Sequence, residues 1–407
     1  MTTTRRIRLG LLFGGRSPEH EISITTAASI AKEADPARIE IVPIYISREG
    51  RWLQLAGSGP LADLAGKLVD ERQIGPLPRR EVLLSGAAGG GLVPVRGSEA
   101  GASPDITIGK EALAKADLQE SSPAPIDVLF PALHGQGGED GSVQGLARLA
   151  GLPCVGAGIL GSALGMDKVS MKRIAACIGI PIPQYVAFTR EDWQKNPSWV
   201  RAEIEEHLNL PIFVKPSGAG SSVGITKLHD LTKLDAAVRD AARYDYRILV
   251  EDGIDARELE VALLGNADPQ ASVVGEVVPG GEFYDYHAKY IDDQSRAVIP
   301  AEIPRETSET VRVMAVRIFR ALDLAGMARA DFLLDRRTGN VYFNEVNTIP
   351  GFTPISMYPM LWEASGIGYR DLITRLVELA IEQHRSTQVE TAAPRVDRGD
   401  PSGKTGS

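Results

Sequence analysis

The stretch IFVKPSGAGSSVGITK, residues 212–227, decides the fold. Residues 212–215 are typical of a buried strand, a Gly/Ser turn follows, and residues 223–227 are typical of a second strand. This is a hairpin and not a Walker A loop, because no Gly-Lys-Ser/Thr opens a helix. Lys215 ends the first strand beside a turn whose backbone N–H groups can cover phosphates. Taken alone, the segment is also compatible with an ordinary hairpin that carries a solvated lysine.

Toward the C-terminus, a second predicted hairpin at residues 328–346 carries a set of polar side chains. Because side chains alternate along a strand, Glu345 and Asn347 lie on one face. Asp331 lies on the paired strand, and Arg329 shares its face. Two carboxylates and an amide suit a hard cation such as magnesium. A guanidinium beside them suits phosphoryl or acyl-phosphate chemistry. A solvated strand face with a salt bridge is the alternative for any one residue, but four converging residues favour a site.

Toward the N-terminus, apolar strands and a helix alternate in βαβ order, which predicts a parallel sheet. The helix covers residues 19–34. The predicted strands are 7–13, 39–46 and 126–133. Residues 56–125 interrupt this pattern as an insertion, and within it the Gly/Ala/Ser-rich residues 85–103 are interpreted as a surface loop.

Two Gly-rich segments follow predicted strands of this sheet. HGQGGEDG, residues 134–141, ends one strand, and ligands of open α/β sheets bind at such strand ends. His134 there can orient or deprotonate a small substrate, although a tight turn with an exposed histidine is equally compatible. GGRSPEHEIS, residues 14–23, ends another strand. We interpret Glu19 as helix N-terminal charge that complements the macrodipole, and keep Glu21 as a candidate partner for a substrate ammonium.

Composition excludes several classes of protein. The 407 residues are 43% hydrophobic and 24% charged, so the chain as a whole is not disordered. There is no apolar run of the roughly 20 residues that a membrane helix needs, and the N-terminus lacks a signal peptide. The net charge of -9 without a long basic run argues against nucleic-acid binding. Two cysteines exclude a disulfide framework and a Cys-rich zinc site, and suggest the reducing cytoplasm.

Seven motifs in a fixed order then make the resemblance specific. They are GGRSPEHEIS, ALHGQGGEDG, GMDK, VKPSGAGSSVGI, FYDYHAKY, RADFLL and FNEVNTIPGFT. Together they resemble the D-alanine–D-alanine ligase family of the ATP-grasp superfamily. The resemblance covers nearly all of residues 5–385, apart from part of the insertion.

The resemblance implies an ATP-grasp fold of α/β and α+β class, in which two domains grip ATP. A Rossmann-like parallel-sheet domain would occupy residues 1–164. The central ATP-grasp subdomain would occupy 165–246, and the C-terminal metal-binding domain 247–385. Residues 386–407 are expected to form a disordered tail.

The resemblance also implies site residues. The nucleotide-contacting group is Lys168, Lys215, Ser222, Glu251, Glu258 and Lys289. The ligands of two magnesium ions, which manganese can replace, are Asp331, Glu345 and Asn347. The residues around the two D-alanine molecules are His134, Ser356 and Met357. The catalytic group is Glu21, Ser221, Tyr290, Arg329 and Gly351. The chain departs from the family at Gly253, where an aromatic residue usually packs on adenine.

The implied reaction is the ATP-dependent ligation of two D-alanine molecules, through D-alanyl phosphate, to the D-alanyl-D-alanine of peptidoglycan precursors. Arg329 and the Gly351 N–H would stabilise the oxyanion, while residues 279–294, with Lys289 and Tyr290, would form a lid. The alternatives are a D-alanine–D-lactate ligase, another ATP-grasp carboxylate–amine ligase, and a nucleotide-binding regulatory protein. FYDYHAKY favours the dipeptide product, and no metal ligand or lysine is missing. The partners implied are ATP, D-alanine and a second copy of the chain, with no membrane and no nucleic acid.

Overall fold

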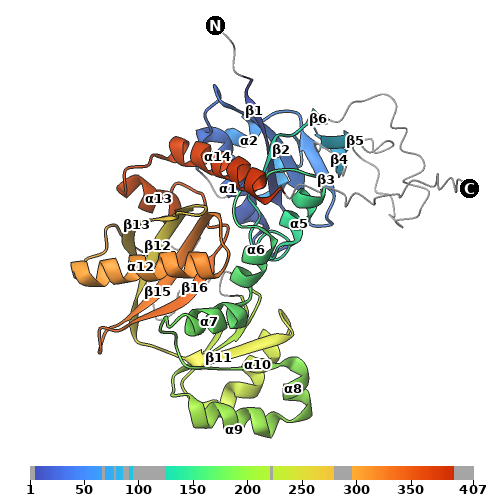
Figure 1. The fold of residues 1–407 in the computed structure, drawn as a ribbon. Coiled ribbons are helices and arrows are strands. Elements are labelled where there is room, and N and C mark those ends of the chain that lie inside the picture. The colour runs from blue at the N-terminus through green and yellow to red at the C-terminus, as the bar shows by residue number, and fades with distance from the viewer. Residues whose placement is uncertain are drawn as a thin grey trace, which may run out of the picture.

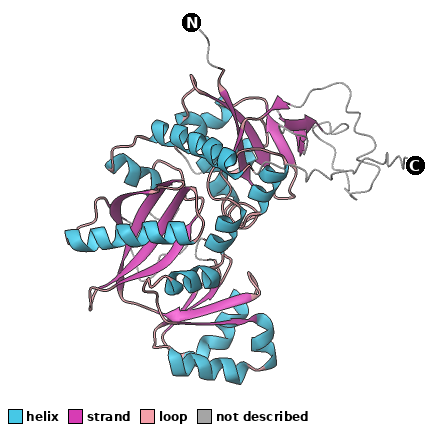
Figure 2. Cartoon of the chain, in the orientation of Figure 1, coloured by secondary structure: helices cyan, strands magenta, loops and turns pink. Residues whose placement is uncertain are grey.

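The computed structural model describes residues 5–66, 69–77, 79–85, 91–94, 124–220, 223–278 and 296–388. Within these ranges the chain forms three sheets, of seven, four and five strands. Figure 1 shows the seven-stranded sheet at the top, the five-stranded sheet in the middle and the four-stranded sheet at the bottom. Helices flank all three sheets (Figure 2), so the fold is of mixed α/β class. No helix in the described part of the chain combines the length and apolarity needed to cross a bilayer.

The N-terminal sheet confirms the predicted βαβ order. Its centre is β1 (Ile7–Gly14), which pairs in parallel with β2 (Ile39–Ile46) and with β7 (Val128–Pro131). The helix α1 (His20–Glu33) connects β1 to β2. Four shorter strands extend the sheet beyond β2: β3 (Trp52–Leu55), β4 (Arg79–Ser85), β5 (Gly91–Pro94) and β6 (Ala124–Pro125).

The prediction of a surface loop over residues 85–103 is wrong for residues 91–94. These form β5, which pairs antiparallel with β4. Leu92 is fully buried, so apolar burial at one position stabilises a strand that the small-residue composition concealed. The prediction is also wrong for Ser85, which ends β4, and the rest of that predicted loop lies outside the described residues.

The four-stranded sheet confirms the predicted hairpin. Its strands are β8 (Tyr185–Thr189), β9 (Ile212–Pro216), β10 (Thr226–Leu228) and β11 (Arg247–Asp252). β9 pairs antiparallel with β10 and β11. Ile212 and Val214 pack against the helices on one face, so the alternation places Phe213 and Lys215 on the opposite face. The helices on the packed face are α8 (Arg190–Lys195), α9 (Pro197–His207) and α10 (Leu234–Ala241).

The five-stranded sheet is antiparallel throughout. Its strands are β12 (Ala256–Gly265), β13 (Gln270–Val278), β14 (Arg296–Val298), β15 (Gly326–Asp335) and β16 (Val341–Asn347). The amphipathic helix α12 (Arg305–Ala321) packs Val311, Ala315 and Ile318 against one face. The other face carries the polar residues of β15, where burial alternates residue by residue.

Two helices follow the five-stranded sheet: the first packs on β12 and β13, and the second returns the chain to the N-terminal sheet. They are α13 (Met357–Ala364) and α14 (Tyr369–Thr387). The red α14 lies beside α1 in Figure 1, and Arg38 pairs with Glu378 at 2.7 Å. α14 runs through Thr387, so the prediction of a disordered tail from residue 386 is wrong for its first two residues; residues 389–407 lie outside the described residues.

The remaining helices are short. They are α2 (Gly59–Ala62), α3 (Glu71–Ile74), α5 (Ser142–Leu149), α6 (Ile159–Met166), α7 (Lys168–Cys177) and the 3₁₀ helix η1 (Leu231–Lys233). α6 and α7 connect the N-terminal sheet to the four-stranded sheet. Domain boundaries at 164/165 and 246/247 stay predictions.

Candidate active site

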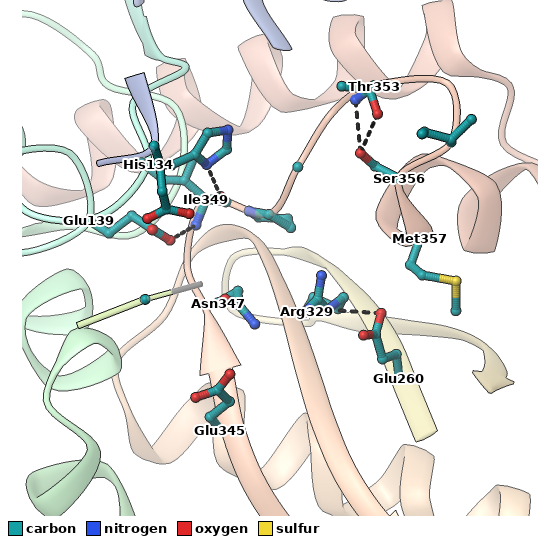
Figure 3. Close-up of a pocket in the computed structure, with 15 residues that line it drawn as sticks. His134, Glu139, Glu260, Arg329, Glu345, Asn347, Ile349, Thr353, Ser356 and Met357 are labelled. Carbon is teal, nitrogen blue, oxygen red and sulfur yellow. Dashed lines mark hydrogen bonds and ion pairs between the residues drawn. The ribbon is translucent and has the colours of Figure 1, made fainter. Parts of the chain in front are cut away.

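One pocket is lined by segments from all three sheets and is shown in Figure 3. The N-terminal domain contributes residues after β1 and β7, and the turn after β9 contributes Gly220. β12, β15, β16 and the loop after β16 contribute the rest. The polar side chains that line it are Glu19, His134, Glu139, Glu260, Arg329, Glu345, Asn347, Thr353 and Ser356.

The face shared by β15 and β16 holds the polar set predicted from the sequence. Asp331 stands opposite Glu345, and Arg329 stands opposite Asn347. Arg329 donates from two nitrogens to the two oxygens of Asp331, each at 2.7 Å, and its Nε lies 3.0 Å from Glu260. Asn347 Nδ2 donates to Asp331 at 3.1 Å. The prediction of a common face is therefore confirmed.

A bulge interrupts the hairpin beside this face. Asp331 pairs with Glu345, but Phe332 pairs with Phe343, which leaves Asn344 as an extra residue on β16. The carbonyl of Asn344 accepts a hydrogen bond from Lys172 Nζ at 3.2 Å. The bulge thus presents a backbone acceptor next to Glu345.

The oxygen donors of Asp331, Glu345 and Asn347 fit a hard divalent cation. Two carboxylates and a side-chain amide are the donor types that magnesium and manganese prefer. No group of three or more His, Cys, Asp or Glu side chains gathers at metal-binding distance within the described residues. A cation bound here would therefore need the amide oxygen of Asn347 beside the two carboxylates, together with oxygens from substrate or water.

Lys168 and Lys215 do not line the pocket, but Lys168 contacts Glu345, which does. Lys168 opens α7, and its Nζ lies 3.2 Å from Glu345 and donates to the carbonyl of Ala219 at 2.8 Å. Lys168 therefore connects the turn after β9 with the predicted metal ligand. An ammonium in this position can contact phosphate oxygens bound between the two sheets.

A second lysine on the same helix was missed by sequence reasoning. Lys172 is 1% exposed, and its Nζ pairs with Glu251 at 2.8 Å. Lys215 pairs with the other oxygen of Glu251. The signal for Lys172 was its spacing, since residues four apart share one helix face with Lys168.

The charges of this trio hold Glu251 ionised. Although burial alone would raise the pKa of Glu251, Lys172 and Lys215 lower it to about 2. Burial lowers the pKa of Lys172 despite Glu251. Burial also acts to lower the pKa of Lys215, but the negative charges of Glu251, Glu345 and Glu258 outweigh it and raise that pKa. The carboxylate of Glu258 therefore interacts electrostatically with this lysine.

The two glutamates after β1 have different surroundings in the structure. Glu19 is 7% exposed and lines the pocket. Its Oε2 lies against two glycines. A Cβ added to Gly135 would come within 2.8 Å of this oxygen, and a Cβ added to Gly220 within 3.1 Å. Glu21 does not line the pocket; its carboxylate pairs with Arg48. Glu19 is the residue before α1 and Glu21 lies in its first turn, so the two side chains leave the backbone in different directions.

His134 and Glu139 follow β7 and both contact Ile349. His134 Nδ1 lies 3.1 Å from the carbonyl of Ile349, and its Nε2 lies 3.0 Å from Thr26 Oγ1. Burial lowers the pKa of His134. The Glu139 carboxylate accepts from the N–H of Ile349 at 3.0 Å, and burial together with Glu19 raises its pKa to about 7.

The loop after β16 brings the remaining predicted residues to the pocket. Gly351, Ser356 and Met357 all line it. Ser356 Oγ accepts from the N–H of Thr353 at 3.0 Å, and a Cβ on Gly351 would come within 2.9 Å of that oxygen. The close approach explains the glycine. The predicted Ser221, Ser222, Lys289, Tyr290 and lid 279–294 lie outside the described residues and stay predictions.

Two family models match the chain. The model described as D-ala D-ala ligase N-terminus matches residues 8–157, and the model described as D-ala D-ala ligase C-terminus matches residues 174–378. A D-alanine--D-alanine ligase of Geobacillus kaustophilus is 44% identical over 386 residues, covering 95% of this chain and 98% of that protein. One of Acetivibrio thermocellus is 45% identical over 383 residues, covering 94% and 98%.

Solved structures agree with these relatives. The D-alanine-D-alanine ligase of Coxiella burnetii has a TM-score of 0.76 at 30% identity, covering 94% of this chain and 96% of that one. VanG D-Ala:D-Ser ligase of Enterococcus faecalis has a TM-score of 0.76 at 31% identity, covering 92% and 100%. The chain belongs to the D-alanine–D-alanine ligase family, whose fold is the ATP-grasp fold.

Proposed function

We propose that the protein joins two D-alanine molecules to D-alanyl-D-alanine, with hydrolysis of ATP to ADP and phosphate, for peptidoglycan precursor synthesis. One observation carries the proposal: cationic, carboxylate and backbone groups from three sheets line a single pocket. Lys168 contacts the pocket residue Glu345, which supports a phosphate-binding group beside a site for a small amino acid. Full-length similarity to D-alanine--D-alanine ligases supports the same conclusion.

ATP is required because a carboxylate is a poor acyl donor to an amine. The carboxylate of the first D-alanine attacks the γ-phosphorus of ATP, which releases ADP and forms D-alanyl phosphate. The amine of the second D-alanine then attacks the acyl carbon, and a tetrahedral oxyanion expels phosphate. Every step is a transfer between substrates, so no residue acts as a covalent nucleophile.

The described residues fit the positions that the first step needs. Lys168 and Lys215 hold the phosphates from α7 and β9, and Glu251 and Glu258 hold the nucleoside end. Glu19 replaces Glu21 as the partner of the first ammonium, since it is the glutamate that lines the pocket. Two magnesium ions, held by Asp331, Glu345 and Asn347, would neutralise phosphate charge when bound, and manganese could replace them.

For the second step, an oxyanion needs preorganised donors in a site that excludes water. Arg329 is 17% exposed and is oriented by Glu260 and Asp331, so its guanidinium is already fixed before substrate arrives. The N–H of Gly351 is the second donor. Ser356, at the start of α13, is placed to hold the carboxylate of the second D-alanine, with Met357 packing beside it.

The test measures phosphate release from ATP with D-alanine, D-serine, D-lactate or no acceptor, and identifies each product by mass spectrometry. D-Alanyl-D-alanine is expected as the main product with D-alanine alone. Phosphate release that needs no D-alanine, or a depsipeptide as the main product, would overturn the proposal.

We also propose that the protein acts as a homodimer in the cytoplasm. Four apolar side chains of α5 and α6 are exposed, namely Leu146, Leu149, Ile159 and Leu160, and Leu149 is 81% exposed. A second copy of the chain could cover them. Both cysteines are free thiols, which suits a reducing compartment that also supplies ATP.

A further inference from the structure

The backbone N–H and carbonyl of Ile349 are both hydrogen-bonded by side chains that lie far away in the sequence. Glu139 accepts the N–H of Ile349 at 3.0 Å, and His134 lies 3.1 Å from its carbonyl oxygen. Both side chains come from the segment that follows β7, about 210 residues away. Figure 3 shows these two contacts side by side at one edge of the pocket.

The contact from His134 fixes its tautomer. A carbonyl oxygen only accepts, so Nδ1 carries the proton and donates to Ile349. Nε2 is then the acceptor for the hydroxyl of Thr26, at 3.0 Å. Both ring nitrogens of this buried, neutral histidine are therefore used within the protein.

Glu139 also spans two segments. One oxygen accepts from Ile349, and the other accepts from the N–H of Gly135 at 2.9 Å, which closes the turn of its own loop. Burying a carboxylate is costly unless its oxygens are hydrogen-bonded, so these two N–H groups are what make the position tolerable. Removal of the carboxylate would leave them without that acceptor.

Ile349 lies between two residues of the candidate site, so its hydrogen bonds also position them. Two residues before it stands Asn347, on the polar face of the hairpin, and two residues after it stands Gly351, in the pocket lining. Phe352 packs edge-on against Phe130 of β7, with ring centroids 5.9 Å apart. The exit of β16 is therefore aligned on the N-terminal sheet by two hydrogen bonds and one aromatic contact.

We propose that Glu139 and His134 are positioning residues that hold Ile349 so that Asn347 and Gly351 face the reacting groups. This inference rests on the proposed ligation. It assigns His134 a role through the backbone of Ile349, in addition to any contact with the first D-alanine. Errors of about 1 Å in such alignment cost about 100-fold in rate.

The first test compares Glu139→Gln with Asp140→Asn. The amide that replaces the Glu139 carboxylate would keep one acceptor oxygen but turn an N–H toward a backbone N–H. Asp140 is the matched control, because it also accepts two backbone N–H groups, from Gly137 at 2.8 Å and Ser142 at 3.0 Å. Those contacts stay within the loop.

We expect Glu139→Gln to lower kcat at least tenfold while the affinity for ADP, measured by calorimetry, changes less than twofold. The nucleotide-binding lysines are not part of the Ile349 contact, so a selective loss of kcat is the signature of positioning. Asp140→Asn is expected to keep kcat within twofold. Equal kcat values for the two variants, in an enzyme whose wild type makes the dipeptide, would overturn the inference; a wild type that makes no dipeptide would instead overturn the proposed function.

The second test uses rescue at His134 and does not depend on whether Glu139→Gln folds. In His134→Asn, the amide nitrogen takes the place of Nδ1 and can still donate to Ile349. In His134→Gln, the amide group takes the place of Nε2 and that donor is lost. We expect His134→Asn to keep at least tenfold higher kcat than His134→Gln. The reverse order would show that Nε2, and not the bond to Ile349, is what the reaction needs.

Discussion

At the scale of single residues, the two glutamates after β1 have opposite surroundings. Glu19 is buried against Gly135 and Gly220, whereas Glu21 is 30% exposed and pairs with Arg48. Loss of a buried charge pair, as proposed between Glu19 and the substrate ammonium, costs several kcal/mol. An exposed pair such as Glu21 with Arg48 contributes at most about 1 kcal/mol. We therefore expect Glu19→Gln to lower kcat/KM for D-alanine about 100-fold and Glu21→Gln to change it about twofold or less. Steady-state kinetics of the two variants checks this, and a larger loss in Glu21→Gln would contradict it.

A second prediction at this scale concerns the pH dependence of Glu251. Its pKa is lowered from 4.5 to about 2, so its contribution to stability is present above pH 4.5 and is lost as pH falls toward 2. A shift of this size corresponds to about 3 kcal/mol at neutral pH. The unfolding free energy that Glu251→Gln removes should be about 2 kcal/mol smaller at pH 3 than at pH 6. Urea denaturation at the two pH values measures it, and a loss that does not vary with pH would refute the assignment.

The sequence could predict strand faces but not helix phase or tertiary contacts. Strand alternation placed Asp331, Glu345 and Asn347 on one face because a period of two needs only the strand and its register. The different surroundings of Glu19 and Glu21 depend on where α1 starts to within one residue, which a sequence pattern does not give. The bond between Glu139 and Ile349 joins two segments far apart in the chain, and no local pattern contains it.

At the scale of elements, α14 is held to the N-terminal sheet by apolar packing more than by charge. Leu376 is fully buried, whereas Arg38 and Glu378 are 54% and 40% exposed. A buried Leu→Ala substitution costs about 2–5 kcal/mol, and an exposed ion pair contributes up to about 1 kcal/mol. Leu376→Ala should therefore destabilise the fold by at least twice as much as Glu378→Ala. Chemical denaturation of both variants gives the comparison, and equal losses would mean that the ion pair anchors the helix.

At the scale of the whole molecule, the pocket needs residues from all three sheets, while the exposed apolar side chains of α5 and α6 lie elsewhere. If a second copy covers these side chains, Leu149→Glu should shift the protein from dimer to monomer. Replacing Lys233, which is distant in sequence on η1, by Glu provides a charge control. Sedimentation velocity at micromolar concentration distinguishes the two states. A wild type that sediments as a monomer would remove the basis for the dimer.

The bulge at Asn344 has a consequence for changes in chain length. Deleting Asn344 restores a regular ladder in which Phe343 and Glu345 are consecutive, so Glu345 still stands opposite Asp331. Deleting Val346 instead makes Asn347 the direct neighbour of Glu345 and turns its side chain to the opposite face. Deleting Asn344 would thus keep the polar face intact, whereas deleting Val346 would disrupt it. The deletion of Asn344 also removes the carbonyl that Lys172 contacts, so in homologues that lack this residue the buried lysine would be held by Glu251 without that backbone acceptor.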